Sequence, residues 1–273
     1  MKNIFQYYRP TLGQSWLMVA LLLVGGVVIG VLLPNAPQSL TYTLMMLLPI
    51  AFCWLMARQA ATVATAETRV TPLNKPRFGK LGAAGFMVLA AVALLFISVV
   101  IEPTTAFLPM PDFIKDVFEK AFVDTPMWDL IISTCIMAPL LEEFLCRGMM
   151  ERGMLTRMKP WKAIAWSAFI FAFMHANPWQ SIPAFLIGLF LGWVYWRTHC
   201  LWATIALHCL NNSISAAITR IWPDLPVDAG LSDILPSSTY WIIYAASVVA
   251  LAAVLCILNE KTLSPEIQAS RQA

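Results

Sequence analysis

Long apolar segments, each close to the length of a membrane-spanning helix, recur along this chain. A helix needs roughly 20 mostly apolar residues to cross the hydrocarbon core of a bilayer. The composition agrees, since 59% of the residues are hydrophobic and only 12% are charged. Ordinary soluble domains have about 45–50% apolar and about 25% charged residues. The sequence therefore predicts an all-α, polytopic membrane protein.

The apolar segments predict about eight transmembrane helices, at residues 15–33, 40–56, 81–101, 127–158, 161–177, 181–196, 201–218 and 239–258. An amphipathic piece at 111–118 is expected to lie on the membrane surface. Pro178 is expected to end the fifth helix, and Pro183 to fall in the first turn of the sixth, where proline is tolerated. The polar tail after the eighth helix is expected to be frayed.

The loops between these helices differ in charge. Loops expected on one side carry the basic residues Arg58, Arg69, Lys75, Arg77, Lys80, Arg152, Arg157, Lys159, Lys162 and Arg197. Loops on the other side carry the acidic residues Asp112, Asp116, Glu119, Asp124, Asp224, Asp228 and Asp233. Because basic loops stay in the cytoplasm, we expect both termini to be cytoplasmic. The compact loops suit a bacterial inner-membrane protein.

The cysteines and the basic residues limit which functions the sequence can have. The six cysteines lie in or beside apolar segments and form no CxxC pair. We therefore expect buried apolar side chains rather than disulfides or a thiolate metal site. No basic patch is interleaved with aromatic residues, so we expect no nucleic-acid partner.

Three charged residues interrupt the apolar run at 138–150: Glu142, Glu143 and Arg147. A charge at bilayer depth costs roughly 2.5–3.5 kcal/mol on insertion scales, so three together need a reason. On a helix, Glu143 and Arg147 are four residues apart and share a face, which lets them neutralise each other. Glu142 is turned about 100° away. The spacing therefore predicts a structural pair and one carboxylate that remains free for chemistry.

Other polar side chains fall at a similar depth in neighbouring helices: His175, His208 and Asn212. At about 1.5 Å per residue, these three and Glu142 all fall in the middle half of the bilayer. His208 and Asn212 are four residues apart and face the same way. Three helices can thus surround one cavity with a carboxylate, two imidazoles and an amide. The alternative is that each residue forms interhelical hydrogen bonds, which fits Asn211 well.

These residues resemble the three motifs of the CPBP family, which contains Rce1-like CAAX prenyl endopeptidases and related bacterial membrane proteases. The similar motifs are Glu142-Glu143-x-x-x-Arg147, Phe171-x-x-x-His175 and His208-x-x-x-Asn212. The resemblance implies an eight-helix intramembrane protease. The motifs fall in residues 127–219, the expected CPBP-like catalytic core. The apolar segments predict N-terminal transmembrane helices and the surface helix at 1–126, and the last transmembrane helix and tail at 220–273.

The resemblance also implies roles. Glu142 and His175 would activate a water molecule, and His208 and Asn212 would stabilise the oxyanion. Glu143 and Arg147 would support the helix geometry. The chemistry is sound, since hydrolysis needs a base near a water and an amide donor at an oxyanion is worth about 2.7–4 kcal/mol.

Several alternatives stay open at this point. Glu142, His175 and His208 could make a three-ligand zinc site, although no HExxH is present, and we favour a metal-free mechanism. A non-catalytic immunity or chaperone protein is an alternative of a different class. The expected partners are a peptide or lipidated-peptide substrate and the membrane lipid around the protein. Since Glu142 and His208 lie nearer the basic loops, we expect the cavity to open towards the cytoplasm or laterally to lipid.

Overall fold

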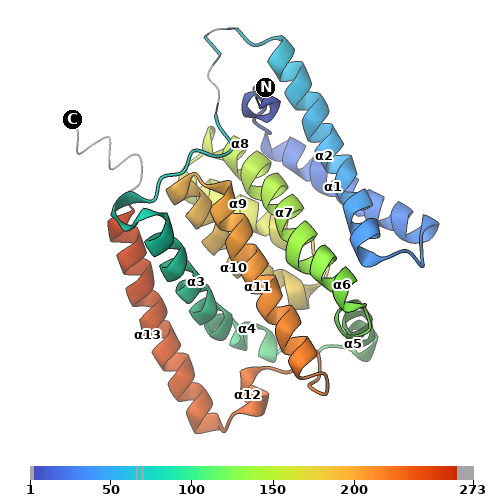
Figure 1. Cartoon of the computed structure of the whole chain (residues 1–273), viewed down its shortest axis with the longest axis vertical. Helices are drawn as coiled ribbons and strands as arrows, with labels where there is room; N and C mark the ends of the chain where they lie inside the picture. Colours follow the sequence, from blue (N-terminus) through green and yellow to red (C-terminus); the bar gives the residue numbers. More distant parts are fainter. Residues whose placement is uncertain (1–2, 66, 69–70, 263–273) are drawn as a thin grey trace.

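The computed structural model describes residues 3–65, 67–68 and 71–262, and these ranges contain helices and loops but no strand (Figure 1). The α-helices are α1 Leu12–Leu32, α2 Gln38–Thr62, α3 Gly82–Ile101, α4 Pro103–Ala106, α5 Asp112–Phe118, α6 Met127–Leu130, α7 Ala138–Glu143, α8 Arg152–Leu155, α9 Pro160–Phe173, α10 Pro178–Thr198, α11 Leu201–Ile221, α12 Leu231–Ile234 and α13 Ser237–Lys261. Short 3₁₀ turns form η1 Ile4–Tyr7 and η2 Gly79–Leu81. Wider π-helical turns form η3 Glu119–Val123, η4 Ile131–Met137 and η5 Phe144–Glu151. The prediction of an all-α chain is confirmed for these ranges.

All eight predicted segments are helical, but the number of membrane spans is not confirmed. In the part of the chain that the structure describes, four helices are long and apolar enough to cross a membrane, at Leu12–Leu32, Gln38–Thr62, Gly79–Ala106 and Ser237–Lys261. Large apolar side chains on these helices are exposed, among them Val31 and Val249. Lipid contact would cover such side chains. The other four spans remain a prediction.

The remaining helices occupy the middle of the molecule. Figure 1 shows α7, α9, α10 and α11 between the pair α1 and α2 and the pair α3 and α13. The segment from α6 to α8 is one continuous helical run in which α-helical and π-helical turns alternate. These central helices carry the charged and amide side chains of the chain's interior, which lowers their hydropathy. Mean hydropathy therefore does not identify these central helices as membrane spans.

The fifth and sixth helices begin and end differently from the prediction. α9 ends at Phe173, and Ala176 has a left-handed backbone with φ 56°. The side chain of Asn177 then caps α10 by accepting from the backbone N–H of Gln180 at 2.9 Å, a strong helix-start signal. Pro178 is the first residue of α10 rather than the end of α9, and Pro183 lies inside the helix rather than in its first turn.

A buried carboxylate joins α2 to the central run. The N-terminus of α2 has no cap from its own sequence, so its first N–H groups need an acceptor from elsewhere. Asp129 of α6 supplies it, with one oxygen 2.7 Å from the N–H of Gln38 and the other 2.8 Å from that of Ser39. Asp129 is 3% exposed. The start of α2 is thereby fixed to the start of the central run.

At the opposite end, a buried guanidinium joins two separate segments to α8. Arg152 donates to the backbone carbonyls of Phe5 and Tyr8 and of Thr71. The N-terminal segment and the loop after α2 are thus held against α8.

The expected frayed tail lies outside the described residues from 263 onwards. Of the cysteines, four are buried as expected, Cys209 is half-buried and Cys256 is exposed on α13, contrary to the prediction.

Candidate active site

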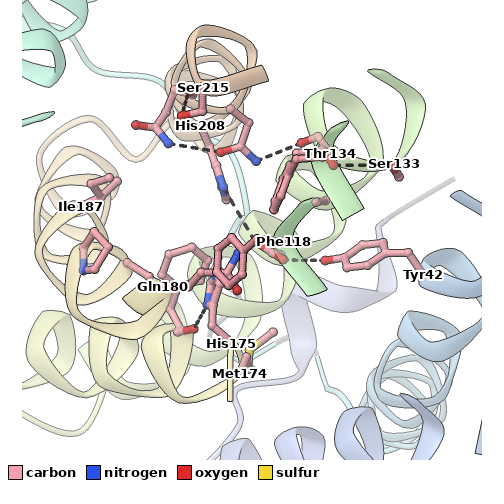
Figure 2. A pocket seen from close by; sticks show the side chains of 18 of the residues that line it. Tyr42, Phe118, Ser133, Thr134, Met174, His175, Gln180, Ile187, His208 and Ser215 are labelled. Atoms are coloured by element: carbon pink, nitrogen blue, oxygen red, sulfur yellow. Dashed lines mark hydrogen bonds and ion pairs between the residues drawn. The ribbon is translucent and has the colours of Figure 1, made fainter. Parts of the chain in front are cut away.

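One cavity of about 590 Å³ lies among the central helices, and all four predicted catalytic residues line it: Glu142, His175, His208 and Asn212. They come from α7, the loop after α9, and α11. In Figure 2, Tyr42 and His208 point towards one another across this space and His175 lies beside them. The structure therefore assembles residues that are up to 70 positions apart in the sequence.

The ion pair predicted from helical spacing is present. Arg147 Nη1 lies 2.8 Å from Glu143 Oε1, and both side chains are fully buried. The other guanidinium nitrogen, Nη2, donates to the carbonyl of Gly188 at 2.9 Å, which ties this helix to α10. The guanidinium also lies over the ring of Phe171, 4.8 Å from its centroid. Arg147 thus neutralises Glu143 and joins three helices.

His208 contacts both carboxylates of the central helix. Its Nδ1 lies 3.0 Å from Glu143 Oε1, and its Nε2 lies 3.8 Å from Glu142 Oε2. A carboxylate can only accept hydrogen bonds, so Nδ1 donates and carries a proton. The bond to Glu143 fixes the ring, and Nε2 remains directed towards Glu142 and the cavity. Glu143 therefore orients a predicted catalytic group in addition to pairing with Arg147.

Glu142 is not without a partner, contrary to the sequence prediction. The hydroxyl of Tyr42 on α2 donates to Glu142 Oε1 at 2.5 Å, as the dashed line in Figure 2 shows. The other oxygen, Oε2, faces His208. Sequence reasoning missed Tyr42 because it lies 100 residues before Glu142 and in no shared motif. A phenol within a predicted apolar helix was the one available signal, since buried tyrosine hydroxyls need a partner.

The ring of His175 is oriented by the helix turn before it. Its Nδ1 lies 2.9 Å from the carbonyl oxygen of Phe171. Because a carbonyl only accepts, Nδ1 carries the proton and Nε2 is left with a lone pair. The ring of Phe171 packs edge-on against both His175 and His208, with centroids 5.1 and 5.5 Å apart. Phe171 therefore sets the positions of both imidazoles.

Asn212 is oriented by two neighbours. Its Nδ2 donates to the carbonyl of Thr134 in η4 at 2.9 Å, and its Oδ1 accepts from Asn211 Nδ2 at 3.2 Å. The amide group has two N–H donors, so one remains for the cavity. Asn211 forms a polar contact as expected, although with the neighbouring residue of its own helix.

Two other ionisable residues lie outside this arrangement. Glu151 is fully buried one helix turn beyond Arg147, and neither of its oxygens has a hydrogen-bond partner among the described residues. It does not line the cavity. His199 lies in the loop after α10 with a left-handed backbone. Burial lowers the pKa of His199, and the nearby charges of Arg77 and Lys75 lower it further.

A zinc ion would need Glu142, His175 and His208 to converge. Within the described ranges, no group of three His, Cys, Asp or Glu side chains is placed to hold a metal ion. Nδ1 of each imidazole is bonded, to Phe171 and to Glu143 respectively, so only Nε2 of each ring could be a metal ligand. Because the three side chains do not form such a group in the described structure, a metalloprotease is not supported.

The cavity reaches the end of the bundle opposite the basic loops, which differs from the expected opening on the basic side, while the expected lateral opening to lipid stays a prediction. Its lining includes Gln38 and Gln180, near the starts of α2 and α10, and Ile101 and Thr219, near the ends of α3 and α11. Two of these helix ends, those of α3 and α11, lead into the acidic loops, and none of the four leads into a basic loop. The depth of a residue along its own helix did not predict which end of the cavity is open. That depends on which neighbouring segments cover each end of the bundle.

Comparison with protein families agrees with the geometry. Residues 124–214 match the family model described as type II CAAX prenyl endopeptidase Rce1-like. This segment is similar to that family. It contains Glu142, His175, His208 and Asn212, but not Tyr42. The CPBP resemblance is thereby supported for this part of the chain.

The Rce1-like domain, together with the apolar helices, indicates an integral membrane protein and, at the family level, a protease of the CAAX type. Searches of curated proteins and of solved structures found no match to the chain.

Proposed function

We propose that this protein is an intramembrane endopeptidase that hydrolyses a peptide bond with a water molecule activated by Glu142 and His175. The observation that carries the proposal is that four side chains of the required chemistry line one cavity. Its substrates are peptides or lipidated peptides in the membrane, as suits an Rce1-like domain. A bacterial inner membrane, with both termini cytoplasmic, is part of the same proposal.

The first step of hydrolysis follows from the atoms that remain free. Glu142 Oε1 is held by Tyr42, so Oε2 takes a proton from water while His175 Nε2 accepts the other O–H and orients the water. The water oxygen then bonds to the carbonyl carbon, and the carbonyl electron pair moves onto oxygen. The proton on Glu142 passes to the leaving nitrogen, the C–N bond breaks, and an acid and an amine are released. General acid–base catalysis of this kind contributes about 10²–10⁴-fold.

The oxyanion is stabilised from α11. Asn212 donates its remaining N–H, and His208 donates from Nε2. Because His208 Nδ1 already donates to Glu143, a second donor requires a proton on both ring nitrogens, which is the imidazolium form. In that form the carboxylates of Glu142 and Glu143 are balanced by Arg147 and His208. A neutral cluster is the arrangement that a low-dielectric site favours.

Replacing Tyr42 by phenylalanine is expected to lower kcat about 10- to 100-fold with little change in KM. A hydrogen bond to a charged group is worth about 1.5–3 kcal/mol, and its loss leaves Glu142 free to turn away from the water. The matched control is Tyr240→Phe, at a buried tyrosine of α13 that does not line the cavity. Turnover by Tyr42→Phe equal to that of the control would show that Tyr42 does not position the carboxylate.

Activity is expected to survive exhaustive chelation, because two imidazoles bonded through Nδ1 and a carboxylate held by Tyr42 can act on water directly. The measurement is turnover of purified protein after dialysis against a chelator, with metal content determined in parallel. Stoichiometric zinc in the active protein, with activity lost on removal and restored on return, would contradict the metal-free mechanism.

Two substitutions of His208 extend this test. A glutamine amide reaches close to the position of Nε2, whereas an asparagine amide reaches close to that of Nδ1. His208→Gln is therefore expected to keep partial activity, and His208→Asn to keep the bond to Glu143 but lose the oxyanion donor. Equal loss in both variants would argue against donation from Nε2.

The proposed function is tested by comparing membranes from cells that contain the wild-type protein or the Glu142→Gln variant. Precursor peptides are expected to accumulate with the variant and to disappear with the wild type, as measured by quantitative proteomics of peptide termini. Identical profiles, with both proteins equally abundant, would favour the non-catalytic alternative.

A further inference from the structure

The residues that line the cavity come from one end of the helical bundle. Figure 1 places α4, α5 and α12 at this end, while η1 and α8 lie at the opposite one. The cavity is bounded there by Phe118 and Phe122, from α5 and η3, and by Val227, from the loop before α12. We call the segments 112–123 and 222–230 the roof of the cavity.

The roof is held mainly by contacts that are weak or easily exchanged. Lys115 Nζ lies 2.7 Å from Asp228 Oδ2 and joins the two roof segments, yet both side chains are about a third exposed. Exposed ion pairs contribute only about 0.2–1 kcal/mol. Trp179 Nε1 donates to the carbonyl of Leu108 at 3.0 Å beside the first segment. No extended hydrophobic cluster of buried residues includes either roof segment in the described part of the chain; Phe122 packs only at the margin of a small one.

The opposite end of the bundle is closed over the same residues. Arg147 and Glu143 are fully buried next to His208 on that side, followed by the fully buried Glu151 and then Arg152. Arg152 covers this end by holding the N-terminal segment and the loop after α2. These buried and bonded side chains lie between Glu142 and the end that carries the basic loops.

We propose that the substrate reaches the active site from the non-cytoplasmic side of the membrane, passing between the two roof segments as a short extended peptide. The orientation follows from the basic loops, which lie at the closed end and are expected in the cytoplasm. A cavity of about 590 Å³ is of the size that holds a small ligand, so it admits a few residues of peptide and excludes a folded domain. That the molecule which enters is a substrate rests on the proposed function, whereas the route by which it enters does not.

The route can be tested with single cysteines in the full-length protein. Ser215 and Thr219 line the cavity, and their hydroxyls bond only to carbonyls of their own helix, so cysteine is tolerated at both. The background carries Cys209→Ala and Cys256→Ala, which remove the more accessible native thiols. Reaction with a membrane-impermeant maleimide is followed in sealed right-side-out vesicles, before and after permeabilisation.

Asp116→Cys and Lys159→Cys serve as markers of the two faces, since both residues are exposed and lie at opposite ends of the bundle. Ser215→Cys and Thr219→Cys are expected to react without permeabilisation, as Asp116→Cys does, whereas Lys159→Cys reacts only after it. Reaction of the cavity cysteines only when Lys159→Cys reacts would overturn the proposal. So would a reversed pattern of the two markers.

The roof itself is tested by charge reversal. Lys115→Asp is expected to speed the reaction of Thr219→Cys by up to about fivefold, the factor that corresponds to loss of an exposed ion pair. The double change Lys115→Asp with Asp228→Lys restores the pair and is expected to return the rate to its starting value. An unchanged rate in the single variant would exclude passage between the roof segments.

These measurements do not require turnover, so they separate the route from the chemistry. Labelling from the expected face by a protein that cleaves nothing would leave the route standing and refute the protease. Labelling from the basic face by an active protease would refute the route alone.

Discussion

Glu142→Gln is expected to reduce turnover by about 10²–10⁴-fold, the contribution of a general base, while leaving the protein folded. Glutamine has nearly the same shape and its amide oxygen can still accept from Tyr42, which now lies 2.5 Å from Glu142 Oε1. It cannot take a proton from water at neutral pH. Turnover of a purified preparation measures the loss, and thermal unfolding in the same detergent measures the fold.

A matched control lies nine residues further along the same helical run. Glu151 is also buried, but it does not line the cavity and its oxygens have no hydrogen-bond partner among the described residues. Glu151→Gln is expected to keep activity, and to keep or raise stability because a buried unpaired carboxylate is costly. Substantial turnover by Glu142→Gln, or an equal loss in the control, would assign the base to another residue.

Arg147→Ala is expected to destabilise the protein by about 3–5 kcal/mol, the usual cost of removing one partner from a buried ion pair. Glu143 would keep only the contact from His208, and the link from Arg147 to the carbonyl of Gly188 would be lost. The expected result is low abundance in membranes and a lower unfolding temperature in detergent.

The double variant Glu143→Gln with Arg147→Met tests whether charge is the cause. It removes both members of the pair while keeping similar side-chain volume, and apolar replacement of a whole buried pair is often tolerated. Abundance is expected to recover in large part relative to Arg147→Ala. If the double variant is as unstable as the single one, packing of Arg147 on Phe171 matters more than the ion pair.

Local spacing was a sound guide to part of this architecture. Apolar length located every long helix, and the four-residue spacing of Glu143 and Arg147 predicted their ion pair. Both properties depend on neighbours within one helix. The partner of Glu142 and the open side of the cavity could not be predicted, because they depend on how α2 and the roof segments pack against helices far away in sequence.

The beginning of α10 shows a different limit. Asn177 and Pro178 form a strong helix-start signal, yet the polar residues Gln180 and Ser181 follow them, so apolar length alone placed the start of this helix three residues late. The π-helical turns of η4 and η5 leave no trace in apolar spacing either. Backbone detail of this kind is decided by packing at the site.

Asp129 has a consequence for how the catalytic unit is defined. Its carboxylate anchors the first N–H groups of α2, and one turn later Tyr42 reaches Glu142. The region of family similarity, 124–214, therefore contains the motifs but not the α2 groups that contact Asp129 and Glu142. In a fragment cut at its boundaries, Asp129 would lack the N–H groups of α2 that it accepts from, and Glu142 would lack the hydrogen bond from Tyr42. Modular transplantation of this domain between membrane proteins has to carry the second helix with it.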